Sequence, residues 1–522
     1  MEKRKIAAGL AAAALLGAVA GCGGSDATVK QQSGEKQTSF TYWSPMTREL
    51  ASKFQTLAEV AMYKEREEKS GVHIEFIHPP VGQEGEQFNL MIASRELPDF
   101  IEYNHWPAYP GGPDKAVTDN VIYRLNDIID KNAPNFKAAL ESNDEWRRQS
   151  MTDNGTIYAF PALNTGKYRT FGGMLIRDDW LKELGLEMPE TIDEWENVLT
   201  AFKEKKGASA PMTGQSTLFA AGGYVSHFNN AYNVSKGVYR EGDTVKYGPT
   251  EPAYKDWITK MNEWYEKGLI DKDFATNATS AADAKILNGD SGVVFGFLGG
   301  GLGKYLSAKE GENFSLTGAP MPVMNKGDVA HFPPLENEVK SPYLAITTAC
   351  KDPESAAEWV DYWYTEEGFD MTNFGVEGLS YNMVDGKHVY TDVILNNPEG
   401  LSVAEAQALY FRAGVGFNQH EEYLMQSYKY PQQLDSLKIW SEITEESKKY
   451  ALPMLTYTTE EADEIAVLAT DIGTTVEENI VKFVIGQYDM SQWDTFQQQL
   501  KDIGVDRYIE IQQAALERYL NR

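Results

Sequence analysis

The chain has 522 residues, of which 42% are hydrophobic and 12% aromatic, and its formal net charge at pH 7 is −29. This composition excludes an intrinsically disordered protein, and the length allows two or three domains. The negative charge repels phosphate polymers and anionic lipid headgroups, so nucleic acid is excluded as a partner.

Residues 1–21 have the layout of a secretory signal peptide. Three cations within the first five residues precede an uncharged run, Ile6 to Gly21, that is rich in Ala, Leu and Gly. This run is too short to span the roughly 30 Å hydrocarbon core of a membrane comfortably, so we expect cleavage. Val19-Ala20-Gly21-Cys22 resembles the bacterial lipobox, in which the cysteine becomes the lipidated first residue. We expect a lipid-anchored protein on the extracellular face of the cell membrane; an ordinary signal peptide that contains a cysteine is the alternative.

Behind Cys22, residues 22–38 are polar and predict a flexible tether. No later stretch has the length and apolarity of a membrane span. With Cys22 lipidated, Cys350 has no partner for an intrachain disulfide, and its strand-like surroundings predict a buried small hydrophobe.

The first globular residues predict a parallel α/β layer. Ser39–Trp43 is rich in β-formers, a helical pattern runs from about residue 48 to 70, and residues 72–77 alternate like a strand. Another short strand is expected at 99–103, followed by a loop of Pro, Gly and aromatic residues at 106–112. Ligands of open α/β sheets bind at the carboxyl ends of the strands, so we expect the site there.

A turn signal at Asn154-Gly155 precedes an apolar run that Pro161 is expected to end, and we place the crossing into a second lobe directly afterwards. Thr191 and Glu194 form a capping box at a helix start. Further elements are expected in this order: a strand at 174–177, helices at 178–184, 254–268 and 280–288, a strand at 292–297, a helix at 353–364, and an almost wholly helical region at 402–522.

Several weak motifs, in a fixed order, resemble one family. They are Gly155-Thr156-Ile157-Tyr158-Ala159-Phe160-Pro161, Ile176-Arg177-Asp178-Asp179-Trp180-Leu181-Lys182-Glu183-Leu184-Gly185, Pro189-x-Thr191-x-Asp193-Glu194-Trp195, Trp264-Tyr265-x-x-Gly268-Leu269-Ile270-Asp271 and Phe374-Gly375-x-Glu377-Gly378-x-x-Tyr381. Together they resemble the carbohydrate-binding, extracellular solute-binding lipoproteins (family 1) of ABC transporters in Gram-positive bacteria. The resemblance covers nearly the whole mature chain.

The resemblance implies a type II periplasmic-binding-protein-like fold: two α/β lobes, a helical C-terminal region, and a ligand held between the lobes as they close. We expect lobe 1 to comprise residues 39–164 and 328–352, and lobe 2 to comprise 165–327 and 353–522. It also implies an oligosaccharide ligand, ABC permease subunits as membrane partners, and a monomer. Binding would shift the population from an open to a closed form that docks on the permease.

Some relatives carry a calcium loop after a Phe-Lys-Glu stretch. Here residues 201–206 run directly into Gly207-Ala208-Ser209-Ala210-Pro211, which lacks the alternating oxygen ligands that calcium needs. We therefore expect no calcium site there, no other metal site and no cofactor.

A sugar site needs flat aromatic platforms and bidentate polar groups. Trp43, Tyr103, Trp106 and Phe297 lie at strand ends beside Pro or Gly, where side chains should project into the cleft. Tryptophans at helix-face positions are expected in the core instead: Trp180, Trp195, Trp359 and Trp363.

The resemblance places the turn that carries Glu377 and Tyr381 at the cleft rim. Glu377 would accept hydrogen bonds from two adjacent sugar hydroxyls, or alternatively fix the turn through backbone N–H groups. Further ligand-binding candidates are Phe171, Tyr224, His227 and Arg412. We expect His227 to be a neutral hydrogen-bond partner rather than a metal ligand.

Two other classes remain open. A secreted glycoside hydrolase needs only two opposed carboxylates, which an acidic chain can supply. No Gly-x-Ser-x-Gly elbow and no His-Glu-x-x-His helix occurs, however, so we predict a binding protein rather than an enzyme and assign no catalytic residue. The other alternative is a binding lipoprotein that serves a peptide importer or a sensor.

Overall fold

A six-stranded sheet forms the centre of lobe 1. The computed structural model describes residues 36–215 and 227–522, and Gln37–Arg522 forms one unit. The strands are β1 (Ser39–Trp43), β2 (His73–Ile77), β3 (Phe100–Tyr103), β4 (Phe160–Asn164), β11 (Val339–Ile346) and β14 (Gly416–Asn418), in the order β14-β4-β11-β3-β1-β2. Strand β1 pairs in parallel with β2 and β3, and β11 runs antiparallel between β3 and β4. The carboxyl ends of β1 and β3 therefore meet at one edge.

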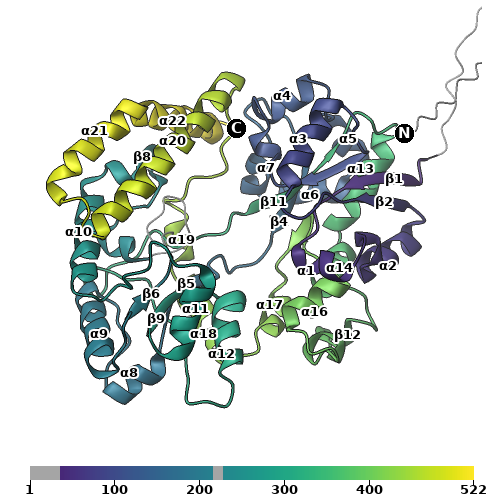
Figure 1. The fold of residues 1–522 in the computed structure, drawn as a ribbon. Coiled ribbons are helices and arrows are strands. Elements are labelled where there is room, and N and C mark those ends of the chain that lie inside the picture. The colour runs from purple at the N-terminus through teal and green to yellow at the C-terminus, as the bar shows by residue number, and fades with distance from the viewer. Residues whose placement is uncertain (1–35, 216–226) are drawn as a thin grey trace, which may run out of the picture. The chain divides into compact units, whose positions relative to one another are not determined.

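A four-stranded sheet forms lobe 2. Its strands are β5 (Gly172–Ile176), β6 (Met212–Thr213), β9 (Val293–Phe297) and β10 (Thr317–Gly318), in the order β10-β5-β9-β6. All five residues of β5 are buried, as expected of a strand that is covered on both faces. Figure 1 shows this sheet and its helices α8, α9 and α10 in a lobe separate from the first sheet.

Helices surround both sheets. Those of lobe 1 are α1 (Arg48–Lys53), α2 (Ala61–Ser70), α3 (Glu84–Ser94), α4 (Gly112–Thr118), α5 (Asn126–Asn132), α6 (Pro134–Ser142), α7 (Asp144–Gln149), α13 (Pro353–Asp361), α14 (Glu366–Phe374), α15 (Asp392–Leu395), α16 (Val403–Tyr410) and α17 (Glu421–Ser427), with the hairpin β12 (Tyr381–Val384) and β13 (Lys387–Tyr390). Those of lobe 2 are α8 (Asp178–Leu184), α9 (Ile192–Lys205), α10 (Pro252–Glu266), α11 (Thr279–Asn288), α12 (Lys304–Ala308), α18 (Pro431–Ser441), α19 (Thr444–Ser447), α20 (Thr459–Val484), α21 (Trp493–Ile503) and α22 (Val505–Leu520), with the hairpin β7 (Val238–Glu241) and β8 (Thr244–Tyr247).

Local sequence signals set several of these elements. The capping box at Thr191 and Glu194 starts α9, with the Thr191 hydroxyl accepting from the Glu194 N–H. All four tryptophans expected in the core are buried: Trp180, Trp195, Trp359 and Trp363. Cys350 is buried too, and burial raises the pKa of its thiol to about 12.

Two local expectations were wrong. The helix expected at 48–70 is divided into α1 and α2, because Phe54 adopts an extended conformation after α1 and a 3-10 turn at Leu57–Glu59 intervenes. Pro161 does not end the apolar run but lies inside β4. The pairing of β4 with β11 is irregular beside it, between Lys340 and Tyr343, where a missing N–H is tolerated.

The chain returns to lobe 1 for longer than expected. We expected residues 353–522 to belong to lobe 2, but side chains from Ala356 to Val415 lie in the hydrophobic core of lobe 1. Strand β14 pairs with β4, and Gln426 of α17 bonds the backbone of β13. The chain leaves for lobe 2 only at α18, where Trp440 packs in a lobe 2 core. The amphipathic pattern of α13 predicts a helix with one apolar face, but not which sheet that face covers.

Three described segments connect the lobes, and we call them the crossing segments: residues 165–171, 319–338 and 428–430. Arg169 of the first is buried and donates to the backbone oxygens of Asn164 and Asn337, at 3.1 and 3.4 Å. It also faces Glu338 at 3.7 Å. The first and second crossing segments are therefore bonded to each other.

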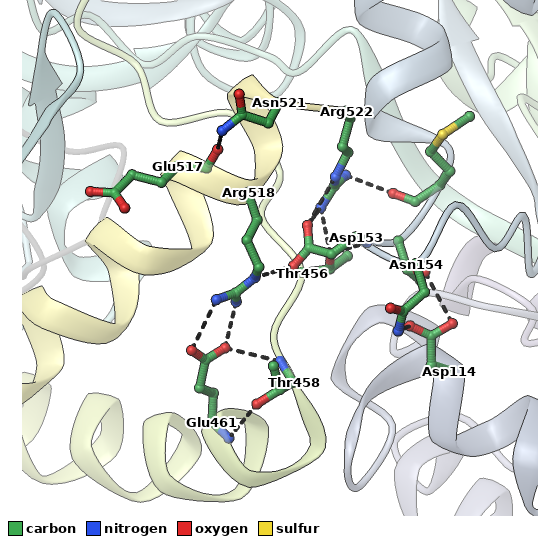
Figure 2. A network of polar contacts seen from close by, with 12 residues as sticks. Asp114, Asp153, Asn154, Thr456, Thr458, Glu461, Glu517, Arg518, Asn521 and Arg522 are labelled. Carbon is green, nitrogen blue, oxygen red and sulfur yellow. Dashed lines mark hydrogen bonds and ion pairs between the residues drawn. The ribbon is translucent and has the colours of Figure 1, made fainter.

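A second connection lies at the C-terminus, in an ion-pair network that we call the C-terminal clasp: Asp153, Glu461, Arg518 and Arg522. Asp153 of lobe 1 accepts from Arg518 Nε at 2.6 Å and from Arg522 Nη2 at 2.6 Å (Figure 2). Arg518 also donates to Glu461 of α20. The end of α22 is thus bonded to the turn that follows α7 in lobe 1.

Candidate ligand-binding cleft

A cavity of about 520 Å³ lies where the crossing segments meet lobe 1. Its lining includes residues from every part of this junction: Pro45 and Thr47 after β1, Phe411 and Arg412 after α16, Asn418 and Gln419 at β14, and Phe171, Glu336 and Tyr428 of the crossing segments. The Thr47 hydroxyl accepts from the Leu50 N–H and so starts α1 at the wall of the cavity. Strands β1 and β14 thus both contribute to the cavity through their carboxyl ends.

Arg412 is one of two cations among the described residues that line this cavity, and the other is Lys340. Its guanidinium pairs with Glu102 at the end of β3 and donates to the Tyr63 hydroxyl at 2.9 Å. Tyr42 donates to the other Glu102 oxygen at 2.5 Å. Burial lowers the pKa of Arg412, but the Glu102 carboxylate together with Tyr63 and Tyr42 more than offsets this, so the pKa is raised overall. Arg412 is therefore a fixed, permanently charged donor group, with 16% of its side chain still exposed.

Glu336, which also lines the cavity, accepts hydrogen bonds from three side chains. One of its carboxylate oxygens accepts from Gln419 Nε2 at 2.6 Å, Lys340 Nζ at 2.8 Å and Asn164 Nδ2 at 3.4 Å. Asn164 precedes the first crossing segment, Lys340 follows the second, and Gln419 precedes the third. All three donors belong to lobe 1, so Glu336 attaches the end of the second crossing segment to that lobe.

Lobe 2 contributes apolar rings at the start of β5 and the end of β9. Phe297 is 47% exposed, and its ring packs edge-to-face on Phe295 at 5.3 Å. A Cβ at Gly172 would approach both rings to about 3 Å, so only glycine leaves them room. Phe171, directly before Gly172, lines the cavity. Phe171 and Phe297 thus offer aromatic surface on the side of lobe 2 where the first crossing segment enters.

A smaller cavity of about 330 Å³ lies behind this edge, lined by His227, Lys236 and residues of the second crossing segment. His227 packs near Phe295, and neither of its ring nitrogens has a hydrogen-bond partner in the described part of the chain. Burial, and less strongly Lys236, lowers the pKa of His227 to about 3, so the ring is neutral at pH 7. Lys236 Nζ is shielded from solvent and also lacks a described partner, and burial lowers its pKa to about 7.

Three of the expected aromatic platforms are buried instead. Trp43, Tyr103 and Trp106 are 4%, 6% and 0% exposed and pack around Phe88. Trp106 Nε1 donates to the Ile101 carbonyl at 3.1 Å. Helix α3 covers the strand ends and supplies Phe88, so these rings offer no open face for stacking. Trp43 and Tyr103 do lie at the ends of strands, as expected. The local sequence pattern does not show, however, that α3 packs over them.

Glu377 and Tyr381 lie together, but away from Arg412. They line a separate cavity of about 740 Å³ on lobe 1, with Tyr362, Lys69 and Asp370. Glu377 is exposed, whereas Tyr381 is largely buried against Phe374. Of the remaining candidates, Tyr224 and Cys22 lie outside the described residues. Of the expected ligand-binding residues that the structure describes, the cavity of about 520 Å³ therefore brings together only Arg412 and Phe171. Phe297 is exposed on lobe 2, and His227 lines the smaller cavity.

Three residues that line the cavities were not singled out from the sequence: Tyr428, Glu336 and Lys236. Tyr428 lies in a crossing segment that we did not expect, since we assigned residues 353–522 to lobe 2. Glu336 follows the expected lobe boundary at 327/328 but belongs to no motif, and Lys236 precedes a short hairpin without any motif. A signal did exist for Glu336, since it belongs to the polar and proline-rich stretch at 333–338, directly before β11.

Two sheets with separate cores, joined by crossing segments that reach a cavity, are the architecture of a two-lobed binding protein. A family model described as "Bacterial extracellular solute-binding protein" matches residues 47–368, more than half of the chain. The protein belongs to this family. It is therefore an extracellular solute-binding protein of the kind that serves transporters, and its family is not one of enzymes.

Curated relatives agree with this. The chain is 23% identical to the fructooligosaccharide ABC transporter substrate-binding protein FusA of Streptococcus pneumoniae, over 87% of this chain and 86% of FusA. It is 26% identical to the lipoprotein LipO of Bacillus subtilis, over 64% of this chain and 66% of LipO. The alignment with LipO therefore leaves about a third of each protein unmatched.

Solved structures share the fold. The alginate-binding protein AlgQ2, without calcium ion, superimposes with a TM-score of 0.72 at 25% identity, over 93% of this chain and 99% of that one. FusA in complex with kestose has a TM-score of 0.72 at 22% identity, over 92% and 99%. The two-lobed fold expected from sequence is confirmed. In the part of the chain that the structure describes, no helix combines the length and apolarity needed to cross a membrane.

Proposed function

We propose that the protein captures an oligosaccharide between its lobes and delivers it to an ABC permease. The observation that carries this proposal is the cavity at the crossing segments, which combines a fixed guanidinium, Arg412, with the aromatic ring of Phe171. Arginine donors suit pairs of sugar hydroxyls, and aromatic faces suit the C–H face of the ring. The names of FusA and of a polygalacturonan/rhamnogalacturonan-binding relative, YtcQ of Bacillus subtilis, support a carbohydrate ligand.

Capture would work by population shift. A ligand that touches Arg412 of lobe 1 and Phe297 of lobe 2 at once binds the closed form more tightly than the open form. The bonds of Glu336 to Gln419 and Lys340 attach the second crossing segment to lobe 1, and we propose that the crossing segments absorb the motion of the lobes. Only the closed form would then dock productively on the permease.

A thermal-shift screen of the domain from Ser39 onward tests the proposal. The panel contains neutral and acidic oligosaccharides, amino acids and short peptides, because a ligand that binds only the folded state raises the melting temperature. A large shift with one glycan class, and recovery of that glycan intact, is the expected result. Recovery of cleaved glycan would indicate a glycoside hydrolase, and a shift with peptides alone would overturn the sugar assignment.

Phe297→Ala is expected to weaken binding of the glycan found in that screen about tenfold, because lost ring burial of about 1–2 kcal/mol corresponds to such a factor. Isothermal titration measures the change. The melting temperature of the free protein should hardly move, since the ring is 47% exposed. Val467→Ala, which removes an exposed apolar side chain of α20, is the matched control. Equal affinities for wild type and the Phe297 variant would exclude this ring from the site.

We further propose that Cys22 carries a lipid anchor, as its motif and the similarity to the lipoprotein LipO suggest. In a bacterial host, Cys22→Ala should move the protein from the membrane fraction to the medium, as detected by immunoblotting. Cys350→Ala is the control and should stay with the membrane, because Cys350 is buried. Retention of the Cys22 variant in the membrane fraction would argue against the anchor.

A further inference from the structure

Two histidines and an aspartate converge on lobe 1, outside the ligand-binding cleft. They are Asp370 of α14, His388 of β13 and His420 directly before α17. One potential ligand atom from each lies within 4.8 Å of the other two. His388 Nε2 is 3.1 Å from Asp370 Oδ1. We expected no metal site from the sequence, in which these three residues form no ligand motif.

A fourth residue, Glu422, orients His388. Glu422 Oε2 lies 2.8 Å from His388 Nδ1 and accepts the backbone N–H of His388 at 2.9 Å. In the neutral ring, donation from Nδ1–H to this carboxylate leaves the lone pair of Nε2 directed at Asp370. Two lone pairs 3.1 Å apart repel each other unless a proton or a cation lies between them. At protein metal sites, a histidine that binds the metal through one ring nitrogen commonly donates the N–H of the other nitrogen to a carboxylate.

Aromatic packing holds both histidine rings in place. Phe374 stacks on His388 with 4.2 Å between ring centroids and an interplanar angle of 6°. The His420 ring contacts Phe374 and Phe369, each at 5.1 Å. The rings of His388 and His420 are themselves 5.2 Å apart. Such packing fixes ligand positions before a metal arrives, and so reduces the ordering cost of binding.

An acidic entrance leads to the cluster. Asp370 lines the cavity of about 740 Å³ that also contains Glu366 and Glu377 in its walls. Its side chain remains 24% exposed, whereas His388 is 11% exposed. A cation can thus reach Asp370 from solvent, through a cavity whose carboxylates attract positive charge.

We propose that Asp370, His388 and His420 bind a divalent transition-metal ion, with Zn²⁺ as the best match to their chemistry. Imidazole nitrogen and carboxylate oxygen are zinc ligands, and two such atoms on one tetrahedral ion with bonds of about 2.0–2.1 Å lie about 3.3 Å apart. The observed 3.1 Å between His388 Nε2 and Asp370 Oδ1 is close to this value. Calcium is excluded, since it requires six or more oxygen ligands. Water would complete the tetrahedron.

Binding would rearrange the start of α17. His420 Nδ1 accepts the backbone N–H of Glu422 at 3.2 Å and so caps this helix. If the neutral His420 ring binds a metal through Nε2, its proton must be on Nδ1. Nδ1 can then no longer accept the Glu422 N–H, so this hydrogen bond is lost. The metal replaces that lost bond by connecting α14, β13 and α17, and α17 leads directly to the crossing segment that contains Tyr428.

A competition titration against a chromophoric zinc indicator tests the proposal, using chelator-treated protein from Ser39 onward. We expect one equivalent of Zn²⁺ with roughly micromolar or tighter affinity. Co²⁺ substitution should give the intense visible absorption of a tetrahedral site. His388→Gln and Asp370→Asn should each abolish this absorption, and Glu422→Gln should weaken zinc binding about 10- to 100-fold.

His73→Gln is the matched control, because His73 on the same lobe also contacts a glutamate, Glu67, but at the surface. It should retain full zinc binding. The melting temperature of each metal-free variant, compared with metal-free wild type, shows whether the variant is folded. Absence of stoichiometric zinc binding in the wild type overturns the proposal. Zinc binding that survives both His388→Gln and Asp370→Asn in folded protein overturns it as well.

Discussion

Replacing Arg412 by methionine should lower the free energy of unfolding of lobe 1 by about 3–5 kcal/mol, because it leaves a buried carboxylate without its partner. Glu102 is only 2% exposed, and its remaining contacts are the hydroxyls of Tyr42 and Ser44. Chemical denaturation, followed by tryptophan fluorescence, measures the change. Binding of the glycan should be lost together with the guanidinium donors.

Two further variants separate the charge effect from the loss of side-chain volume. The double variant Glu102→Gln/Arg412→Met removes both charges and should recover most of the lost stability, but not the ligand binding. Arg507→Met is the surface counterpart, since Arg507 pairs with Glu464 at 2.8 Å in an exposed position. It should cost no more than about 1 kcal/mol. Wild-type stability in the Arg412 variant would mean that Glu102 does not depend on this partner.

Asp153→Asn should destabilise the C-terminal clasp by about 3 kcal/mol, because one carboxylate serves two guanidinium groups there. Arg522 is only 3% exposed, although it keeps the carbonyls of Arg148 and Met151 as acceptors. We expect a lower melting temperature and faster amide hydrogen exchange in α22, as measured by mass spectrometry. Exchange in β1 and β3 should be unchanged, since the clasp does not contact them.

Glu517→Gln provides the control on the same helix. Glu517 points away from Asp153 in Figure 2 and bonds Gln513 at 3.1 Å. Its replacement should leave both the melting temperature and the exchange of α22 at wild-type values. If Asp153→Asn behaved in the same way, the clasp would not contribute to the contact between α22 and lobe 1.

Only some of the residues expected at the ligand-binding cleft lie together in the structure. Phe171 and Arg412 were singled out from the chain, and the structure brings them to one cavity. Glu377 was expected at the same cleft, but it lines another cavity. A motif assigns a residue to a turn, whereas the distance between two turns depends on every element packed between them.

The sequence by itself determined the local elements and the family. The capping box at Thr191, the burial of Trp195 and the β-rich run at Ser39–Trp43 are set by neighbours within a few residues, so their patterns are readable directly. Only the tertiary structure decided which sheet α13 covers, that α3 buries Trp43, and that His388 meets Asp370. These contacts join residues distant in the chain, and one apolar face or one histidine fits many partners until packing selects among them.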